Sequence, residues 1–591
     1  MTPLWLVPFV LAGQSFRGQT LAGSRAQGGT DSLAARVDSI FAPFTRRDAP
    51  GCEVAVVHAG TLLYQTAYGM ADVALEVPLT PATPTLIASA SKQFTALGIL
   101  LLVQDGRLAL DDDVRRYVSE VPRFGHPITV RQLLTHTSGL REQWNLFYMA
   151  GWRSSDLETK DDFLRLVQRQ RALNFTSGTE FLYSNTGYTL LAIIIERVSG
   201  MSFRQFLQMW IFTPLEMSHS GVREDPGQPV AHLAAGYWGH APSDLRLARV
   251  PFGFAGPTGV FTTVEDLAKW DANFYEARVG SIPLLALMST PGRLTDGTAT
   301  GYGMGLFVGT YQKRRMISHA GSDPGYKADI VRFPDERLTV AVLCNAFDVA
   351  PTPLALRVAD IYLGALPATS DSAGEGRRGA VMSSRPQAVS ASAIPATSLA
   401  GIYWWNRSTA QTRRFFLEDG VLLLDGGGEG KFKLTPLGNN RYQLGAAPRR
   451  YVFAFQRRAA YRLSVVEEVE GSRPLSYEAV RATRMTAERE LVGSYYSTEL
   501  EVRWDVELRN GRLELDRHRM DPAILTRVFG DVFQAENFFV IEFVRDAAGS
   551  PVAVDVTTER ARHVRFERVN EIGSTHTESR RTLRRHSPPE P

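Results

Sequence analysis

Residues 85–108 of the chain read TLIASASKQFTALGILLLVQDGRL. The apolar run from residue 94 to residue 103 predicts a buried helix over about 89–105. Lys92 stands at the start of that helix, and the chain has only seven lysines among its 65 basic residues. Unlike arginine, a lysine can lose its proton when it is removed from water. Lys92 is therefore a candidate base.

Ser89 precedes Lys92 by three residues, which places both side chains on one face of the predicted helix. A serine hydroxyl is a weak nucleophile that needs an adjacent base, and a neutral Lys92 meets that need. The S-x-x-K pattern alone is weakly specific, because a capping serine followed by a surface lysine gives the same four residues.

Tyr183 and Asn185 form a second motif, in FLYSNTGYTL, just before another apolar helix. A phenol beside an ammonium group is expected to have a lowered pKa, so Tyr183 is predicted to share a proton with Ser89 and Lys92. Asn185 is predicted to hold Lys92 and a substrate carbonyl. The alternative is a tyrosine packed on a helix start and an asparagine in a turn.

His319 and Gly321 form a third motif at the end of the strand-like run KRRMISHAG. A glycine at that place lets a substrate backbone approach closely. A lone histidine is more often a structural residue with its hydrogen bonds satisfied. We give His136, in THTSG, the same structural interpretation and expect it to hold the loop after its helix.

The three motifs in this order resemble the serine β-lactamase and penicillin-recognising family, in which S-x-x-K, Y-x-N and K-T-G or H-x-G surround one site. Further similar segments are LLTHTSGL at 133–140, PLEMSHS at 214–220 and AGPTGVFTTVEDLAKW at 255–270. The sequence is most similar to the class C branch with its DD-peptidases, D-aminopeptidases and esterases. The resemblance covers about residues 35–365.

The resemblance implies roles for the motif residues. Ser89 is the acylated nucleophile, and Lys92 and Tyr183 transfer the proton. Asn185 orients Lys92 and the substrate amide. A catalytic cofactor or metal is not expected, since no metal-ligand cluster is visible in the sequence.

The third motif lines the pocket in this family. The backbone N–H groups of Ser89 and Ser322 would form the oxyanion hole, and Gly321 lies between Ser322 and the pocket-lining His319. Many relatives carry a lysine in place of His319. In β-lactamases that lysine helps to bind the carboxylate of the β-lactam drug. This departure lowers the expectation of a dedicated β-lactamase.

The family fold is α/β (α+β): an antiparallel five-stranded-type sheet with strand order 2-1-5-4-3, flanked by helices. Cys52 begins the first strand and Cys344 ends the last. Taken from the residues alone, the two cysteines are either buried free thiols or partners in a disulfide. The family topology makes the two strands antiparallel neighbours. The resemblance therefore implies that the Cα atoms of Cys52 and Cys344 are separated by about 4.4–6.8 Å, the range for a disulfide.

The C-terminal half contains an internal repeat. LAGIYWW at 399 recurs as LVGSYYS at 491, GVLLLD at 420 as GRLELD at 511, and NRYQL at 440 aligns with DVFQA at 531. Short alternating strands separated by turns predict two small antiparallel barrels, which resemble the lipocalin-like domains of D-aminopeptidase-type relatives. Such domains can form one side of an active site and restrict which substrates enter it.

The expected organisation follows from 591 residues, too many for one hydrophobic core. The predicted segments are a signal peptide at 1–26, a β-lactamase-like hydrolase domain at 30–365, a linker at 366–397, barrels at 398–485 and 490–570, and a disordered tail at 571–591.

The first 26 residues predict an exported protein, periplasmic or secreted. No later segment has the about 20 apolar residues of a membrane span, so none is expected after processing. A net charge of +3, with no zinc-finger spacing or basic helix, gives no support for a nucleic-acid partner.

The predicted function is that of a serine hydrolase that forms an acyl-enzyme on small peptide, amide or ester substrates, most similar to D-aminopeptidases and DD-peptidases. Two alternatives stay open: a carboxylesterase or weak β-lactamase on the same site, and a non-catalytic binding or scaffold protein. The intact set of three motifs argues against the second alternative.

Overall fold

The computed structural model covers most of the chain. It describes residues 31–239, 242–364, 394–405, 412–425, 431–444, 451–458, 462–469, 475–480, 487–536 and 538–569. The predicted signal peptide and C-terminal tail lie outside the described residues, as does most of the predicted linker.

Six antiparallel strands form the central sheet of the first domain, in the order β12-β13-β14-β15-β1-β2. Their bounds are β1 Cys52–His58, β2 Thr61–Tyr68, β12 Phe307–Tyr311, β13 Arg314–Asp323, β14 Tyr326–Phe333 and β15 Leu338–Cys344. The strands β2, β1, β15, β14 and β13 lie side by side in the expected order 2-1-5-4-3. A sixth strand, β12, is added at the edge beside β13. The predicted hairpin turn between β1 and β2 is confirmed, with positive φ angles at Ala59 (49°) and Gly60 (80°).

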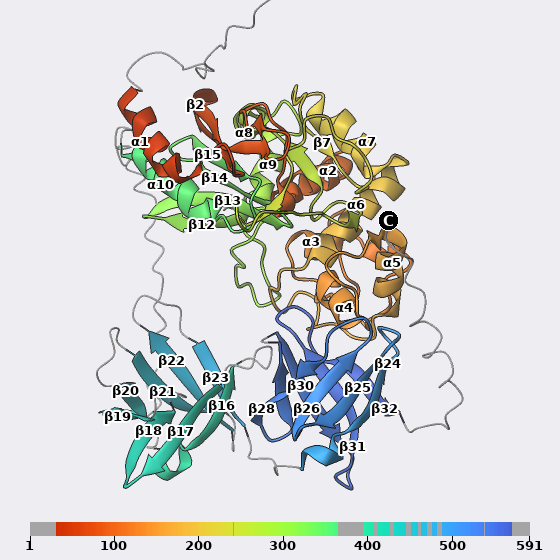
Figure 1. The fold of residues 1–591 in the computed structure, drawn as a ribbon, viewed down its shortest axis with the longest axis vertical. Coiled ribbons are helices and arrows are strands. Elements are labelled where there is room, and N and C mark those ends of the chain that lie inside the picture. The colour runs from red at the N-terminus through yellow and green to blue at the C-terminus, as the bar shows by residue number, and fades with distance from the viewer. Residues whose placement is uncertain are drawn as a thin grey trace, which may run out of the picture.

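Helices cover both faces of this sheet (Figure 1). Their bounds are α1 Asp31–Phe41, α2 Lys92–Gln104, α3 Val130–Leu134, α4 Gln143–Met149, α5 Lys160–Arg169, α6 Asn185–Ser199, α7 Phe203–Leu207, α8 Val264–Glu276, α9 Ile282–Met288 and α10 Pro351–Leu363. In β1, Val54 packs with the core beneath α1 and α10, whereas Ala55 packs with the core that contains α2 and α6. The central strands are therefore apolar on both sides.

Two helix boundaries follow the predicted signals. α6 ends at Ser199 and is followed by Gly200, whose φ of 75° is favoured at a helix C-terminus. α8 begins after Thr263, whose side chain accepts a hydrogen bond from the Asp266 backbone N–H.

Short strands lie in the segments between the longer elements of the first domain: β3 Met70–Asp72, β4 Val77–Pro78, β5 Thr85–Leu86, β6 Glu158–Thr159, β7 Gly221–Val222, β8 Tyr237–Trp238, β9 Arg246–Leu247, β10 Phe252–Gly253 and β11 Val260–Thr262.

The C-terminal half forms one closed barrel and one nearly closed, nine-stranded barrel. The first barrel consists of β16 Gly401–Trp405, β17 Thr412–Glu418, β18 Val421–Asp425, β19 Lys431–Gly438, β20 Arg441–Leu444, β21 Tyr451–Arg458, β22 Arg462–Val469 and β23 Leu475–Val480. The second barrel consists of β24 Gly493–Ser497, β25 Val502–Arg509, β26 Arg512–Arg517, β27 Ala523–Ile524, β28 Thr526–Phe529, β29 Val532–Ala535, β30 Phe539–Arg545, β31 Pro551–Thr557 and β32 Val564–Val569.

The internal repeat is visible in matching contacts at the start of each barrel. The Tyr403 hydroxyl donates to the Leu399 carbonyl at 3.1 Å, and the Tyr495 hydroxyl donates to the Leu491 carbonyl at 2.8 Å. Both leucines and both tyrosines are buried. The repeated sequence therefore encodes the same local structure twice.

The second barrel packs against the end of the first domain that carries α4 and α5, and the first barrel lies beside the second (Figure 1). Trp504 of β25 donates its indole N–H to the Met149 carbonyl at the end of α4. The Arg141 and Glu499 side chains form a buried ion pair of 2.6 Å across the same contact. The second barrel is thus attached to the first domain at Arg141 and at the end of α4.

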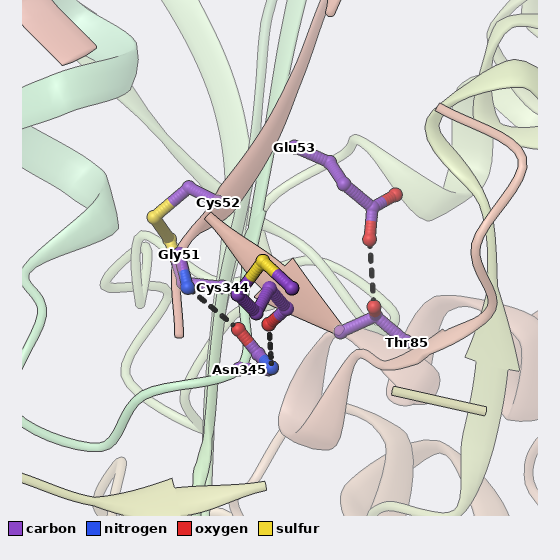
Figure 2. The surroundings of a disulfide bond; sticks show 7 residues. Gly51, Cys52, Glu53, Thr85, Cys344 and Asn345 are labelled. Atoms are coloured by element: carbon purple, nitrogen blue, oxygen red, sulfur yellow. Dashed lines mark hydrogen bonds between the residues drawn. A yellow bond between two sulfur atoms is a disulfide. The ribbon is translucent and has the colours of Figure 1, made fainter. Parts of the chain in front are cut away.

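Cys52 and Cys344 form a disulfide between β1 and β15, where they are direct register partners (Figure 2). Their Cα atoms lie 4.1 Å apart, slightly below the expected range. The Asn345 side chain beside them accepts a hydrogen bond from the Gly51 backbone N–H at 2.8 Å. No helix within the described residues has the length and apolar character needed to cross a membrane.

Candidate active site

Ser89 lies in a short 3₁₀ turn, Ala88–Ser91, that runs directly into α2. Ala88 has a φ of 48°, so the chain turns sharply just before the serine. The turn is held against β11, because the Ile87 N–H donates to the Val260 carbonyl and the Val260 N–H donates to the Ser91 hydroxyl. This places Ser89 at the entry of a buried helix.

Lys92 is fully buried at the first position of α2. Its Nζ lies 3.1 Å from the Ser89 Oγ and donates to the Pro257 carbonyl at 2.8 Å. Burial is the main cause that holds the pKa of Lys92 well below its usual value. A neutral amine in contact with the serine hydroxyl is the arrangement that a base requires.

Tyr183 lies beside this pair, with its ring centroid 4.9 Å from the Lys92 Nζ. The expectation of a lowered pKa for Tyr183 is wrong. Loss of contact with water raises the pKa of its phenol above the usual value, and a hydrogen bond with Ser89 opposes that rise without cancelling it. The reason is that burial disfavours the charged phenolate more than its neighbours favour it.

Asn185 is buried at the first position of α6. Its Nδ2 donates to the Glu142 carboxylate at 2.9 Å. The described structure contains no hydrogen bond between Asn185 and Lys92, and the buried Asn185 Oδ1 has no partner among the described residues. The asparagine therefore has one amide oxygen still available.

His319 lies on β13, almost fully buried, with its ring centroid 6.1 Å from that of Tyr183. Its Nδ1 lies 2.7 Å from the Ala320 carbonyl, which can only accept, so Nδ1 carries the proton. Its Nε2 then accepts from the Tyr302 hydroxyl at 3.0 Å. Burial, with Lys92 nearby, lowers the pKa of His319 to about 3, so the imidazole is neutral at physiological pH.

Gly321 lets β13 lie directly on the Ser89 turn. A Cβ at this position would come within 2.1 Å of the Ile87 carbonyl oxygen. This close approach brings the backbone of Ser322 next to the segment that carries Ser89. The Ser322 hydroxyl accepts a hydrogen bond from the Lys327 Nζ at 2.8 Å.

The structure thus brings the three motifs of the sequence together from α2, the start of α6 and β13. The model of the beta-lactamase family matches residues 37–363, which is more than half of the chain. The chain belongs to the beta-lactamase family. It is a serine hydrolase of that family, with two β-barrel domains after the hydrolase domain.

Curated relatives of this beta-lactamase-family chain include Penicillin-binding protein 4* of Bacillus subtilis, 33% identical over 49% of this chain and 67% of the relative. A D-aminopeptidase of Brucella canis is 29% identical over 54% of this chain. The chain spans only 60% of the length of that relative. The octameric penicillin-binding protein homologue from Pyrococcus abyssi aligns with a TM-score of 0.51 at 24% identity, over 76% of this chain and 100% of that chain. This alignment supports the fold.

His136 of this beta-lactamase-family site has the contacts of a loop-holding residue. Its Nδ1 accepts a hydrogen bond from the Ser184 backbone N–H at 3.2 Å, and its carbonyl accepts one from the Leu182 N–H. Its ring packs on Tyr183 with 4.2 Å between centroids. Burial lowers the pKa of His136 well below its usual value, so it is a neutral support for the Tyr183 loop.

Sequence reasoning missed Asp323, which ends β13 and is almost fully buried. Its carboxylate accepts a hydrogen bond from the Thr258 hydroxyl. Thr258 follows Pro257, the residue whose carbonyl accepts from Lys92. Burial raises the pKa of Asp323 to about 6, and Lys92 acts in the opposite direction. No motif in the sequence marks this aspartate, because its partner comes from a distant loop.

Sequence reasoning also missed Arg560, which belongs to the second barrel. It lies in the loop between β31 and β32, and its guanidinium carbon is 5.8 Å from the Tyr183 ring centroid. Nothing in the local segment ERARH distinguishes it from other surface arginines. Its place in the site depends on how the barrel docks.

Proposed function

We propose that this serine hydrolase acts on D-amino-acid peptides or amides through an acyl-enzyme on Ser89. The observation that carries the proposal is the buried Lys92 amine, which lies 3.1 Å from the Ser89 hydroxyl and whose pKa burial holds well below its usual value. The similarity to a D-aminopeptidase favours peptides and amides of D-residues as the substrate class. Small esters are the second substrate class.

Acylation begins with attack of the Ser89 Oγ on the substrate carbonyl carbon. The proton of the hydroxyl moves to the lone pair of the Lys92 Nζ as the new C–O bond forms. Negative charge develops on the carbonyl oxygen, and the backbone N–H groups of Ser89 and Ser322 are the proposed donors that stabilise it.

Collapse of the tetrahedral intermediate breaks the C–N bond. The proton held by Lys92 passes to the leaving amine through the Tyr183 hydroxyl, which has retained its proton because of its raised pKa. The acyl group stays on Ser89 as an ester. A water molecule then attacks this ester and gives its proton to the same pair. The pair returns that proton to the Ser89 Oγ as the ester C–O bond breaks, which releases the acid and restores the hydroxyl.

Labelling with a fluorescent penicillin or a phosphonate tests the acyl-enzyme, with Ser89→Ala as the matched control. We expect stoichiometric labelling of the wild type and none of the variant. Equal labelling of both proteins, or no labelling of either, would remove the proposal. Turnover of a D-alanyl anilide, a p-nitrophenyl ester and a chromogenic cephalosporin separates the peptidase from the carboxylesterase and weak β-lactamase alternatives.

We further propose that the protein is exported to the periplasm or secreted, and that its partner is a small substrate and not a nucleic acid. The disulfide between Cys52 and Cys344 supports export, because such bonds persist in oxidising compartments. Fractionation of cells that make the native protein tests localisation. Recovery of the full-length chain only from the cytoplasm, with both thiols open to alkylation, would contradict the proposal.

A further inference from the structure

We propose that Arg560 of the second barrel forms an anion-binding subsite beside Ser89 that receives a carboxylate group of the substrate. This inference rests on the proposed peptidase function and specifies its substrate class: peptides with a free carboxylate near the scissile bond. The subsite belongs to the hydrolase only when the second barrel is docked.

The backbone of Arg560 is fixed to the first domain. Its carbonyl accepts hydrogen bonds from the Glu142 backbone N–H at 3.0 Å and from the Asn174 Nδ2 at 2.9 Å. Within the loop, the Ala561 N–H donates to the Thr558 hydroxyl at 3.0 Å, which makes a tight turn. The loop therefore holds the arginine at a defined place before any substrate binds, which reduces the entropy lost on binding.

Flanking residues strengthen this docking. The Asn174 Oδ1 accepts from the Arg562 backbone N–H at 2.7 Å, and the buried Arg141 side chain donates to the carbonyls of Arg562 and His563. The Arg562 guanidinium pairs with the Glu180 carboxylate at 3.0 Å. The side chain of Arg562 is thus used in attachment, whereas Arg560 contributes only its backbone carbonyl.

The side chain of Arg560 lies at the catalytic group. Its guanidinium carbon is 5.8 Å from the centroid of the Tyr183 ring, and the Lys92 Nζ is 4.9 Å from the same centroid. Arg560 is half-buried, and its guanidinium has no hydrogen bond or ion pair with any of the residues that the structure describes. Five N–H donors of a permanent cation are therefore available there.

The neighbouring acidic groups already have partners. The two carboxylate oxygens of Glu142 accept from the Asn185 Nδ2 and from the Asn145 backbone N–H. The Asp323 carboxylate accepts from Thr258. Burial lowers the pKa of both His319 and Lys92, whereas the guanidinium of Arg560 is a permanent cation beside Tyr183, and a planar carboxylate matches its paired donors.

Binding to Ser89→Ala protein tests the subsite without turnover. The probes are N-acetyl-D-alanyl-D-alanine and its C-terminal amide, which differ only in the carboxylate. We expect the acid to bind about tenfold or more tightly than the amide, as a charge-assisted hydrogen bond allows. In the Ser89→Ala background, Arg560→Gln should remove the difference in affinity between acid and amide. Arg560→Lys should retain part of that difference, because the charge remains without the planar arrangement of donors.

Arg565→Gln is the matched control, since Arg565 lies on β32 of the same barrel and pairs with Asp555 of β31. It should leave the preference for the acid unchanged. Equal binding of acid and amide to the Ser89→Ala protein, no binding of either, or an unchanged preference in Arg560→Gln would overturn the subsite. If the preference is present but the wild type neither hydrolyses the probes nor reacts with penicillin, then the proposed function fails and the subsite stands.

Discussion

Lys92 is buried without an ion-pair partner in the described part of the chain, and its Nζ contacts only neutral oxygens, those of Ser89 and Pro257. A buried ammonium without a paired carboxylate is costly, so the folded protein favours the neutral amine. The same burial that makes Lys92 a base thus makes its charged form unfavourable.

Replacing Lys92 with methionine should remove the base and leave the fold intact, because a neutral amine is exchanged for an apolar chain of similar length. We expect the acylation rate to fall by about 10²–10⁴-fold, the usual contribution of a positioned base. Stopped-flow measurement with a p-nitrophenyl ester or fluorescent penicillin checks this. Lys313→Met, at an exposed turn, is the control and should react like the wild type; a Lys92→Met protein that acylates normally would contradict the assignment.

The lowered pKa of Lys92 also predicts a pH dependence of stability. Between this pKa and about 10.5 the unfolded chain binds the proton and the native state does not, so the free energy of unfolding rises with pH in this window. The stability is lost as the pH falls through it. Denaturation of the wild type and of Lys92→Met, measured across pH, gives the difference in their free energies of unfolding. We expect this difference to change with pH by the slope described; a difference that is independent of pH would show that Lys92 is charged in the native state.

At the scale of elements, the site depends on the contact between β13 and the turn that carries Ser89. That contact is possible because Gly321 has no side chain at a point where a Cβ would come within 2.1 Å of the Ile87 carbonyl. The strand and the turn come from distant parts of the sequence, and their backbones supply the proposed oxyanion-hole donors. A displacement of either element therefore acts on the chemistry directly.

Gly321→Ala should push β13 away from the turn. We expect a loss of about 1–3 kcal/mol in stability from overpacking and a fall in acylation rate of about 100-fold from misplacement of the donors. Thermal unfolding and labelling kinetics measure the two effects. Gly309→Ala on β12 is the matched control, since a Cβ there would meet nothing within 4 Å. Equal effects of the two substitutions would argue against the close approach.

At the scale of the whole molecule, the second barrel is attached to the hydrolase domain through a buried charge pair. The Arg141 and Glu499 side chains are 2% and 5% exposed, and Arg141 also donates to two carbonyls of the loop that carries Arg560. Removing one partner of such a pair leaves an uncompensated buried charge. The docking that places Arg560 at the site is thus built on a contact that is sensitive to single substitutions.

Glu499→Ala should destabilise the docked molecule by about 3–5 kcal/mol. Glu501→Ala is the matched control, since Glu501 pairs with Arg169 in the same region but is 57% exposed, and such pairs contribute about 0–1 kcal/mol. Denaturant unfolding measures both values, and limited proteolysis reports release of the barrel. Similar losses in the two variants would show that the buried pair does not hold the domains together.

Much of the site could be predicted from the sequence because its elements carry local signals. Ser89 and Lys92 are three residues apart on one helix, and Thr263 and Gly200 mark helix ends by their own chemistry. The pKa of Tyr183 was predicted wrongly, since it depends on burial and on the charge state of Lys92. Asp323 and Arg560 were missed because their partners lie far away in the chain.

The sequence by itself determined the residues of the three motifs, because short spacings and helix caps are local properties of the chain. Those motifs carry the resemblance to the family, and the order of strands in the sheet was implied by that resemblance. Only the tertiary structure decided that Lys92 is buried enough to be neutral, that Asn185 donates to Glu142, and that Arg560 reaches Tyr183. These depend on desolvation and on domain docking, which arise only when distant segments pack together.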